Sequence, residues 1–214
     1  MSELKKNKMK KFTAEFLLEK LQIQSSKALL ITLLYSSIAI VIFLLMSLIP
    51  QPFIMNGLFK FGLILPLALI PTIAAIRGPL AGFITGYIGT FLFDLVFYRV
   101  ILLVTIPYLP YGLLGLLIGL ANYQINNGKS LAKLAIISTL VFLLSVLLLT
   151  IIGLTMQGIS ILVFLGFVVL PLLSMGIPSI FLLTPLYSRL WHILAYNAYP
   201  SLSRLMAKLK SREE

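Results

Sequence analysis

Long hydrophobic runs alternate with short polar or helix-breaking stretches along most of this chain. A helix needs about 20 apolar residues to cross the hydrocarbon core of a bilayer. The runs therefore predict about six membrane-spanning helices, at Ala28–Leu48, Leu58–Ile76, Leu80–Phe97, Ile106–Tyr123, Leu131–Gly153 and Ile159–Tyr187. Proline and glycine mark the breaks between them, as in Ile49-Pro-Gln-Pro52 and in the tight turn Arg77-Gly-Pro79.

Both ends of the chain are basic and amphipathic instead. At residues 12–24 the apolar Phe12, Phe16 and Leu21 recur at helical spacing, and a lysine cluster precedes them. This pattern predicts a short helix lying on the membrane surface. We therefore expect a basic amphipathic cytoplasmic segment (1–27), a six-helix transmembrane domain (28–187) and a basic cytoplasmic tail (188–214).

The composition supports an all-α integral membrane protein. Apolar residues make up 60% of the 214 residues and charged residues only 11%, whereas a typical soluble domain has about 25% charged residues. The mean hydropathy is +1.07. Between residues 28 and 187 the charged side chains are Lys60, Arg77, Asp94, Arg99, Lys129 and Lys133. The function is therefore expected within the bilayer.

The basic residues lie mostly on one side of the predicted topology. With a cytoplasmic N-terminus, all of the 17 lysines and arginines except Lys60 and Arg99 fall in cytoplasmic tails and loops. The positive-inside rule therefore favours six spans with both termini cytoplasmic, in a multi-pass protein of the cell membrane. Because these charges flank apolar spans, the net charge of +11 indicates anionic lipid headgroups as the counter-charge and no nucleic acid partner.

The polar residues near the predicted outer ends of the spans are the candidates for a binding site. Asp94 is the one carboxylate in the predicted membrane region, and it either contacts a ligand or forms an ion pair with Arg99 or Lys60. Both basic residues either hold an anionic ligand group or extend to lipid headgroups. The uncharged polar residues at this level, either ligand contacts or interface anchors, are Asn56, Tyr98, Tyr108, Tyr111 and Gln157.

The remaining chemistry is sparse and argues against an enzyme. The chain has no cysteine and a single histidine, His192, so neither a metal site nor a thiolate nucleophile is expected. No phosphate-binding glycine loop of the ATPase type occurs. The sequence predicts no catalytic residues, no metal and no cofactor.

Small residues recur at helical spacing on three of the predicted spans. Ala28, Thr32 and Ser36 form a row on the first span. The third and fourth spans carry the glycines Gly78, Gly82, Gly86, Gly89, Gly112, Gly115 and Gly119. Such rows allow helices to approach closely inside the protein, and the row on the first span could equally face a partner protein.

The stretch from Leu65 to Asp94 combines a proline-containing span, the Gly78-Pro79 turn and a glycine-spaced span that ends near an aspartate. It resembles the substrate-binding (S) components of energy-coupling factor (ECF) transporters. Gly115-Leu-Leu-Ile-Gly119 is similar to the glycine-rich fourth span of that family. The size, the spans and the inward termini also match, so the resemblance covers roughly residues 28–187.

The resemblance implies a non-enzymatic subunit that captures a vitamin or related micronutrient from outside. The implied partners are a transmembrane coupling protein and a pair of cytoplasmic ATPases, as in other ABC importers. Docking in the family often uses an Ala-x-x-x-Ala surface of the first span, and the corresponding row here is Ala28, Thr32 and Ser36, of which one is alanine. The residues expected at the substrate are Lys60, Asp94, Tyr98, Arg99, Tyr108, Tyr111 and Gln157.

Two other functions stay open from the sequence. A non-transport membrane scaffold, similar to the small rod-shape morphogenesis proteins, would have a comparable number of spans and few charges. A scaffold needs no ligand cavity, whereas a capture subunit needs one of roughly 300 Å³ or more. A membrane enzyme would require further titratable groups in a cleft beside Asp94.

Overall fold

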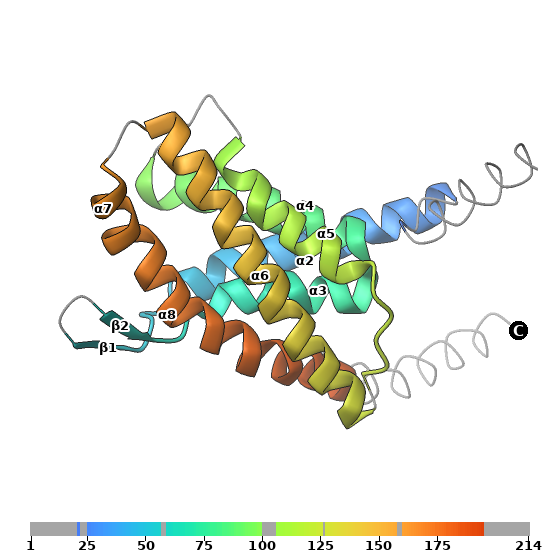
Figure 1. The fold of residues 1–214 in the computed structure, drawn as a ribbon. Helices are drawn as coiled ribbons and strands as arrows, with labels where there is room; N and C mark the ends of the chain where they lie inside the picture. The colour runs from blue at the N-terminus through green and yellow to red at the C-terminus, as the bar shows by residue number, and fades with distance from the viewer. Residues whose placement is uncertain are drawn as a thin grey trace, which may run out of the picture.

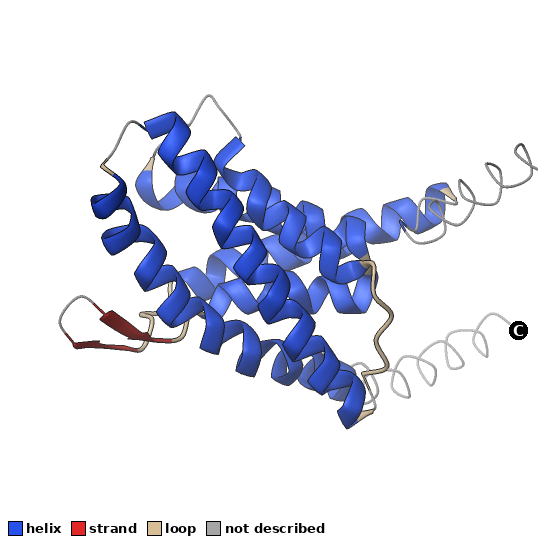
Figure 2. Ribbon diagram, in the orientation of Figure 1, coloured by secondary structure: helices blue, strands red, loops and turns tan. Residues whose placement is uncertain are grey.

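The computed structural model describes residue 21 and residues 25–56, 59–99, 106–125, 127–157 and 160–194. The surface helix predicted at residues 12–24 lies outside this part except for Leu21, and so does the tail after Leu194. The α-helices are α2 (Ser26–Ser47), α3 (Leu69–Arg77), α4 (Pro79–Phe93), α5 (Leu109–Gly119), α6 (Gly128–Gln157), α7 (Ile161–Phe164) and α8 (Leu170–Pro178). They form a bundle with a small hairpin, β1 (Phe53–Asn56) and β2 (Phe59–Gly62), beside α8 (Figures 1 and 2).

Several helices contain tighter or wider turns at proline or near the ends. The 3₁₀ turns are Leu65–Ala68 and Ile106–Tyr108, and the π-helical turns are Asp94–Tyr98, Leu165–Val169 and Ser179–Leu183. Proline has no N–H to donate and clashes with the preceding turn, so it interrupts regular α-helix. This accounts for the breaks around Pro66, Pro107 and Pro178.

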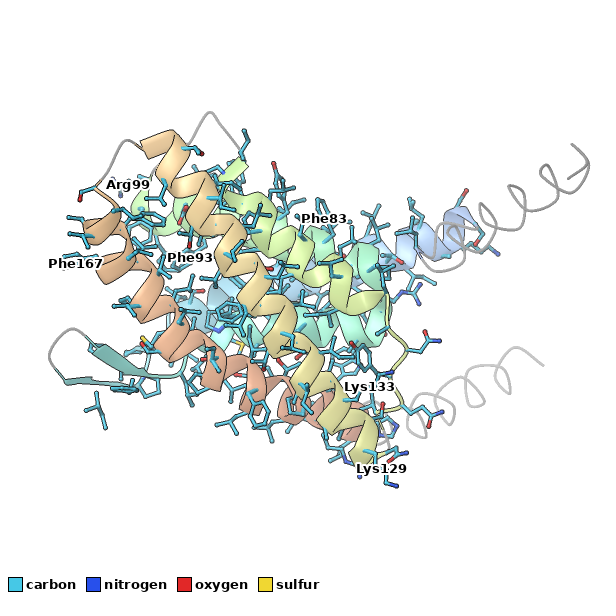
Figure 3. The ribbon with its side chains drawn as sticks, in the orientation of Figure 1. Phe83, Phe93, Arg99, Lys129, Lys133 and Phe167 are labelled. Atoms are coloured by element: carbon cyan, nitrogen blue, oxygen red, sulfur yellow. The ribbon has the colours of Figure 1, made fainter. Side chains whose placement is uncertain are left out.

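The helices match the predicted number of spans in the described part of the chain. Four are long and apolar enough to cross a bilayer: Ser26–Ser47, Pro79–Tyr98, Gly128–Thr155 and Ile161–Leu194. Two further apolar segments, Leu65–Arg77 and Ile106–Gly119, are shorter. Large apolar side chains such as Leu162 (79% exposed) and Phe167 (74% exposed) point away from the bundle, as Figure 3 shows for Phe167. The predicted fold class, an all-α integral membrane protein, is confirmed.

The predicted start of the second span is wrong. Phe59–Gly62, which we expected to be helical, pairs antiparallel with Phe53–Asn56 instead. Pro66 lies in the first turn of the helical segment that follows. Backbone N–H groups in a first turn have no acceptor within the helix, so proline is tolerated there. The span therefore begins at Leu65, and the residues before it are free to form the hairpin.

Three other predicted boundaries also differ from the structure. The fourth span ends at Gly119 and not at Tyr123. The fifth begins at Gly128, where the Asn127 side-chain oxygen accepts a hydrogen bond from the Lys129 N–H, and it continues to Gln157. Much of the predicted loop at 154–158 is therefore helix. The last span continues through Leu194.

Close contact between α4 and α5 forms the most tightly packed part of the bundle. A Cβ added to Gly82 would lie 2.5 Å from the Ala74 Cβ and 2.7 Å from the Gly115 carbonyl oxygen. Gly78, with φ of 99°, makes the reversal between α3 and α4, a conformation that side chains disfavour. The glycine rows of the predicted third and fourth spans thus serve internal packing.

The second half of the bundle packs α6 against the last span. The Phe142 ring of α6 packs against Gly176 of α8, and both residues are buried. Ser179, at the turn after α8, accepts a hydrogen bond from the Ile64 N–H, which lies between β2 and α3. These contacts hold α6, α8 and the hairpin connection around a shared interior.

Candidate binding cavity

A cavity of about 570 Å³ opens at the end of the bundle that carries the hairpin. Its walls come from the ends of α2, α4 and α6, the start of α5, and the α7–α8 segment. The lining residues are Phe43, Ser47, Gln51, Ile64, Pro66, Leu67, Thr90, Phe93, Asp94, Pro107, Tyr108, Tyr111, Leu149, Ile152, Gly153, Phe164, Val168 and Leu172. Small-molecule sites typically measure about 300–1,000 Å³ and are mostly apolar with a few polar groups. This cavity has both properties.

Aromatic side chains form one wall of the cavity and hold each other in place. The Phe43 and Phe93 rings meet edge to face, with centroids 6.5 Å apart. Tyr108 meets Phe91 in the same way at 5.5 Å and Tyr87 at 6.5 Å. Figure 3 shows Phe93 inside the bundle at this end. Edge-to-face packing gives a rigid aromatic surface suited to a flat apolar ligand.

The polar groups of the cavity centre on Asp94 and Tyr108. The Asp94 carboxyl, in the π-helical turn after α4, and the Tyr108 hydroxyl, just before α5, lie close enough to interact. Tyr108 is 3% exposed, and its hydroxyl is paired with the Asp94 carboxyl. A ligand would meet these two groups together, as one polar patch in a mostly apolar wall.

Four more polar side chains complete the lining: Ser47, Gln51, Thr90 and Tyr111. The Gln51 Oε1 is buried and has no hydrogen-bond donor among the described residues. Ser47 and Thr90 donate their hydroxyl protons to the carbonyl oxygens of Phe43 (2.8 Å) and Gly86 (2.6 Å), one helical turn earlier. Their remaining lone pairs can only accept hydrogen bonds. The lining thus offers both acceptors (Asp94, Gln51) and donors (Gln51, Tyr111) to a ligand.

The structure brings together some of the residues predicted for the site and leaves others outside it. Asp94, Tyr108 and Tyr111 line the cavity. Tyr98, 65% exposed, and Arg99, also exposed, do not. Arg99 makes no ion pair with Asp94, although both lie in the described part of the chain. The backbones of Lys60 and Gln157 lie in β2 and α6, and their side chains fall outside the description.

Sequence reasoning missed most of the apolar lining and one polar residue. Gln51 belongs to the helix-breaking Pro-Gln-Pro stretch and is absent from the residues predicted to contact a ligand, yet its side chain lines the cavity. A polar residue between two prolines just beyond a span could have indicated this position. Phe43, Phe93 and Phe164 belong to apolar runs in which nothing distinguishes a cavity wall from a lipid-facing residue.

The row predicted to contact a coupling subunit faces the interior in this conformation. Thr32 is 0% exposed and Ser36 is 1% exposed, and each donates a hydrogen bond to a carbonyl oxygen four residues earlier. The carbonyl oxygen of Ala28 also accepts a hydrogen bond from the Arg77 guanidinium, at 3.2 Å. This placement favours internal packing of α2 and counts against the row as an open docking surface.

A family model described as "ECF-type riboflavin transporter, S component" matches residues 24–190. The chain belongs to this family. Searches of curated proteins and of solved structures gave no match. The match extends from the start of α2 to near the end of the last span, and so includes every lining residue of the cavity.

Membership fixes the general role of the chain. S components of ECF transporters bind a vitamin-like substrate and work with an energy-coupling module, and the family is one of transporter subunits and not of enzymes. The described residues contain no cluster of three or more metal-binding side chains. The chain is a multi-pass membrane protein of a vitamin-uptake system.

Proposed function

We propose that this S component captures a vitamin in the cavity beside Asp94 and delivers it across the membrane together with a coupling protein and two ATPases. The observation that carries the proposal is the cavity of about 570 Å³, whose aromatic walls surround a few buried polar groups, among them Asp94, Tyr108 and the unpaired Gln51 Oε1. The description of the matching family names riboflavin, a flat aromatic vitamin with several hydrogen-bonding groups. Riboflavin is therefore the first ligand to test.

The cavity end of the bundle would face outward. Lys129 and Lys133 lie near the opposite end from Arg99 (Figure 3). α2 begins and the last span ends toward that same end (Figure 1). In the sequence the basic tails directly precede the first of these helices and follow the second, and the positive-inside rule places such a concentration of positive charge in the cytoplasm. Both termini would therefore be cytoplasmic and the hairpin extracellular.

The coupling protein would bind along α2. Within the predicted row only Ala28 keeps partial exposure, so Thr32 and Ser36 would support this contact from inside the bundle. The opposite side of α2 carries exposed apolar residues, among them Leu34 (54%) and Ile38 (47%), which could contact another membrane helix. The chain itself carries no ATPase motif, so energy must come from the partners.

The scaffold alternative is less well supported. A scaffold requires apolar surfaces for partners but no enclosed volume with unpaired polar atoms. A cavity lined by Asp94, Tyr108 and Gln51 is costly to maintain unless it binds something. The family match also points to transport.

Uptake by whole cells tests this function. The chain would be expressed with a coupling protein and two ATPases in bacteria that lack their own riboflavin uptake and synthesis. We expect accumulation of labelled riboflavin that requires both the chain and the ATPases. If the protein binds riboflavin but the cells do not accumulate it, the delivery step is contradicted. If the protein does not bind riboflavin and the cells do not accumulate it, riboflavin is not the vitamin.

A further inference from the structure

We infer that the β1–β2 hairpin is embedded in the lipid leaflet at the cavity end of the bundle, with its apolar side chains against the acyl chains and its backbone edges at the headgroups. The hairpin is then an anchor in the membrane and not a loop in water. The inference goes beyond the proposed function and does not depend on which ligand the cavity binds.

The hairpin exposes large apolar side chains on both of its faces. Ile54 and Phe61 are cross-strand partners in the antiparallel register, so their side chains lie on the same face. They are 75% and 53% exposed. Phe53 precedes Ile54 and so belongs to the opposite face, and it is 52% exposed. Exposed apolar side chains that gather in one place indicate an interaction surface.

The position of the hairpin in the fold indicates that lipid covers this surface. β2 packs against α8 (Figure 1). At 1.5 Å per residue, α8 begins about 14 Å along the axis of the last span from Ile161. Over that length the last span already exposes Leu162 (79%) and Phe167 (74%) to lipid. The apolar side chains of the hairpin therefore continue a lipid-facing surface.

The backbone of the hairpin limits the depth at which it can lie. In a two-stranded sheet, the outer edge of each strand carries N–H and C=O groups that take no part in the pairing. Hydrocarbon cannot satisfy such groups, so open sheet edges do not occur in the bilayer centre. In the interface, headgroups and water satisfy the edges while apolar side chains reach the acyl chains. The interface is therefore the favoured depth.

Both ends of the hairpin lead directly into the cavity wall, which gives the anchor a consequence. The Leu63 N–H donates a hydrogen bond to the Pro52 carbonyl oxygen at 3.1 Å and so closes the base of the hairpin. Gln51 precedes Pro52 and Ile64 follows Leu63, and both Gln51 and Ile64 line the cavity. Contact of the hairpin with lipid thus helps to fix this part of the wall.

Spin labels on single cysteines test the inference, because the natural chain has no cysteine. Full-length protein carrying Ile54→Cys or Phe61→Cys would be labelled with a nitroxide and reconstituted in vesicles of phosphatidylcholine and phosphatidylglycerol. Power saturation then compares collisions with oxygen, which concentrates among acyl chains, and with a nickel chelate, which stays in water. Phe167→Cys is the lipid reference, and Lys129→Cys, at an exposed residue, is the water reference.

We expect the oxygen-to-nickel ratio of both hairpin labels to be several-fold above that of Lys129→Cys and to approach that of Phe167→Cys. Because the side chains of Ile54 and Phe61 are exposed, both variants should keep the melting temperature of the parent protein. A ratio equal to that of Lys129→Cys would place the hairpin in water and overturn the inference. Low accessibility to both oxygen and nickel would show that protein covers the face, for example a second copy of the chain, and would also overturn it.

A tryptophan probe measures the depth without a label. Ile54→Trp would be combined with Trp191→Phe, which leaves one tryptophan in the chain and keeps an aromatic ring against Tyr35. Lipids brominated on the upper part of the acyl chain should quench its fluorescence more strongly than lipids brominated near the chain end. No quenching by either lipid would exclude contact with the acyl chains, and stronger quenching near the chain end would contradict the interfacial depth. Neither experiment uses riboflavin, so the proposed function stands or fails separately.

Discussion

The Ser179 hydroxyl joins two parts of the chain that are 115 residues apart. It accepts a hydrogen bond from the Ile64 N–H and donates one to the Met175 carbonyl oxygen. Ile64 lines the cavity, and the adjacent Leu65 carbonyl accepts a second bond, from the Tyr187 hydroxyl, at 3.5 Å. The last span thus fixes the position of Ile64 and Leu65, the segment before α3 that contributes to the cavity wall.

Replacement of Ser179 by alanine should therefore disturb binding as well as stability. The Ile64 N–H would lose its partner, at a cost of about 1–3 kcal/mol, and the wall could shift. We expect weaker riboflavin binding and a lower melting temperature in detergent. Ser145→Ala is the matched control, because Ser145 is also buried but donates only to Val141 within α6. Identical affinities in the two variants would contradict this role.

The close approach of α4 and α5 can be tested with glycine substitutions. Gly82→Ala places a methyl group against Ala74 and Gly115, so it should destabilise the protein by about 1–3 kcal/mol. Gly166→Ala is the control, since a Cβ there meets nothing within 4 Å. Thermal unfolding should show a loss for the first variant and no loss for the second. Equal melting temperatures would show that the helices are less tightly packed than described.

Cysteine labelling can determine the orientation because the natural chain has no cysteine. A single cysteine at Arg99 should react with a membrane-impermeant maleimide in intact cells. A single cysteine at Lys129, near the other end of the bundle, should react only after the membrane is permeabilised. The reverse pattern would place the cavity mouth in the cytoplasm and exclude capture from outside.

Tyr123, in the connection between α5 and α6, gives a pH-dependent prediction. Burial raises the pKa of its hydroxyl to about 12, from an unfolded value of about 10. The folded state thus favours the neutral hydroxyl. The contribution of Tyr123 to the free energy of unfolding is therefore fully present below pH 10 and is lost as pH rises toward 12. Tyr123→Phe should therefore reduce the loss of thermal stability between pH 9 and 11. An unchanged pH profile would contradict the burial of this hydroxyl.

The number of spans could be predicted from the sequence because a helix must have a minimum apolar length to cross a bilayer. The same signal misplaced the start of the second span. Phe59–Gly62 directly precedes an apolar run and was counted with it, but its pairing with Phe53–Asn56 makes it a strand. Strand pairing depends on a partner segment, so local composition does not reveal it.

The site was predictable only where a residue was chemically unusual for its surroundings. Asp94 stood out as a carboxylate in an apolar region, and it lines the cavity. Arg99 stood out for the same reason but lies on the surface, since a long basic side chain can reach solvent from a helix end. Thr32 and Ser36 illustrate the limit of small-residue patterns, because the spacing does not tell which neighbour the row contacts.

The central claim is that the cavity holds the transported vitamin, and filling the cavity tests it most directly. Leu149→Trp places a larger side chain in the lining, whereas Leu147→Trp, on the same helix but 57% exposed, places it outside the bundle. A ligand at a hundred times its Kd stabilises the folded state by about 2.7 kcal/mol. We predict that riboflavin raises the melting temperature of the wild type and of Leu147→Trp but not of Leu149→Trp. Equal stabilisation of all three proteins would show that the ligand binds elsewhere.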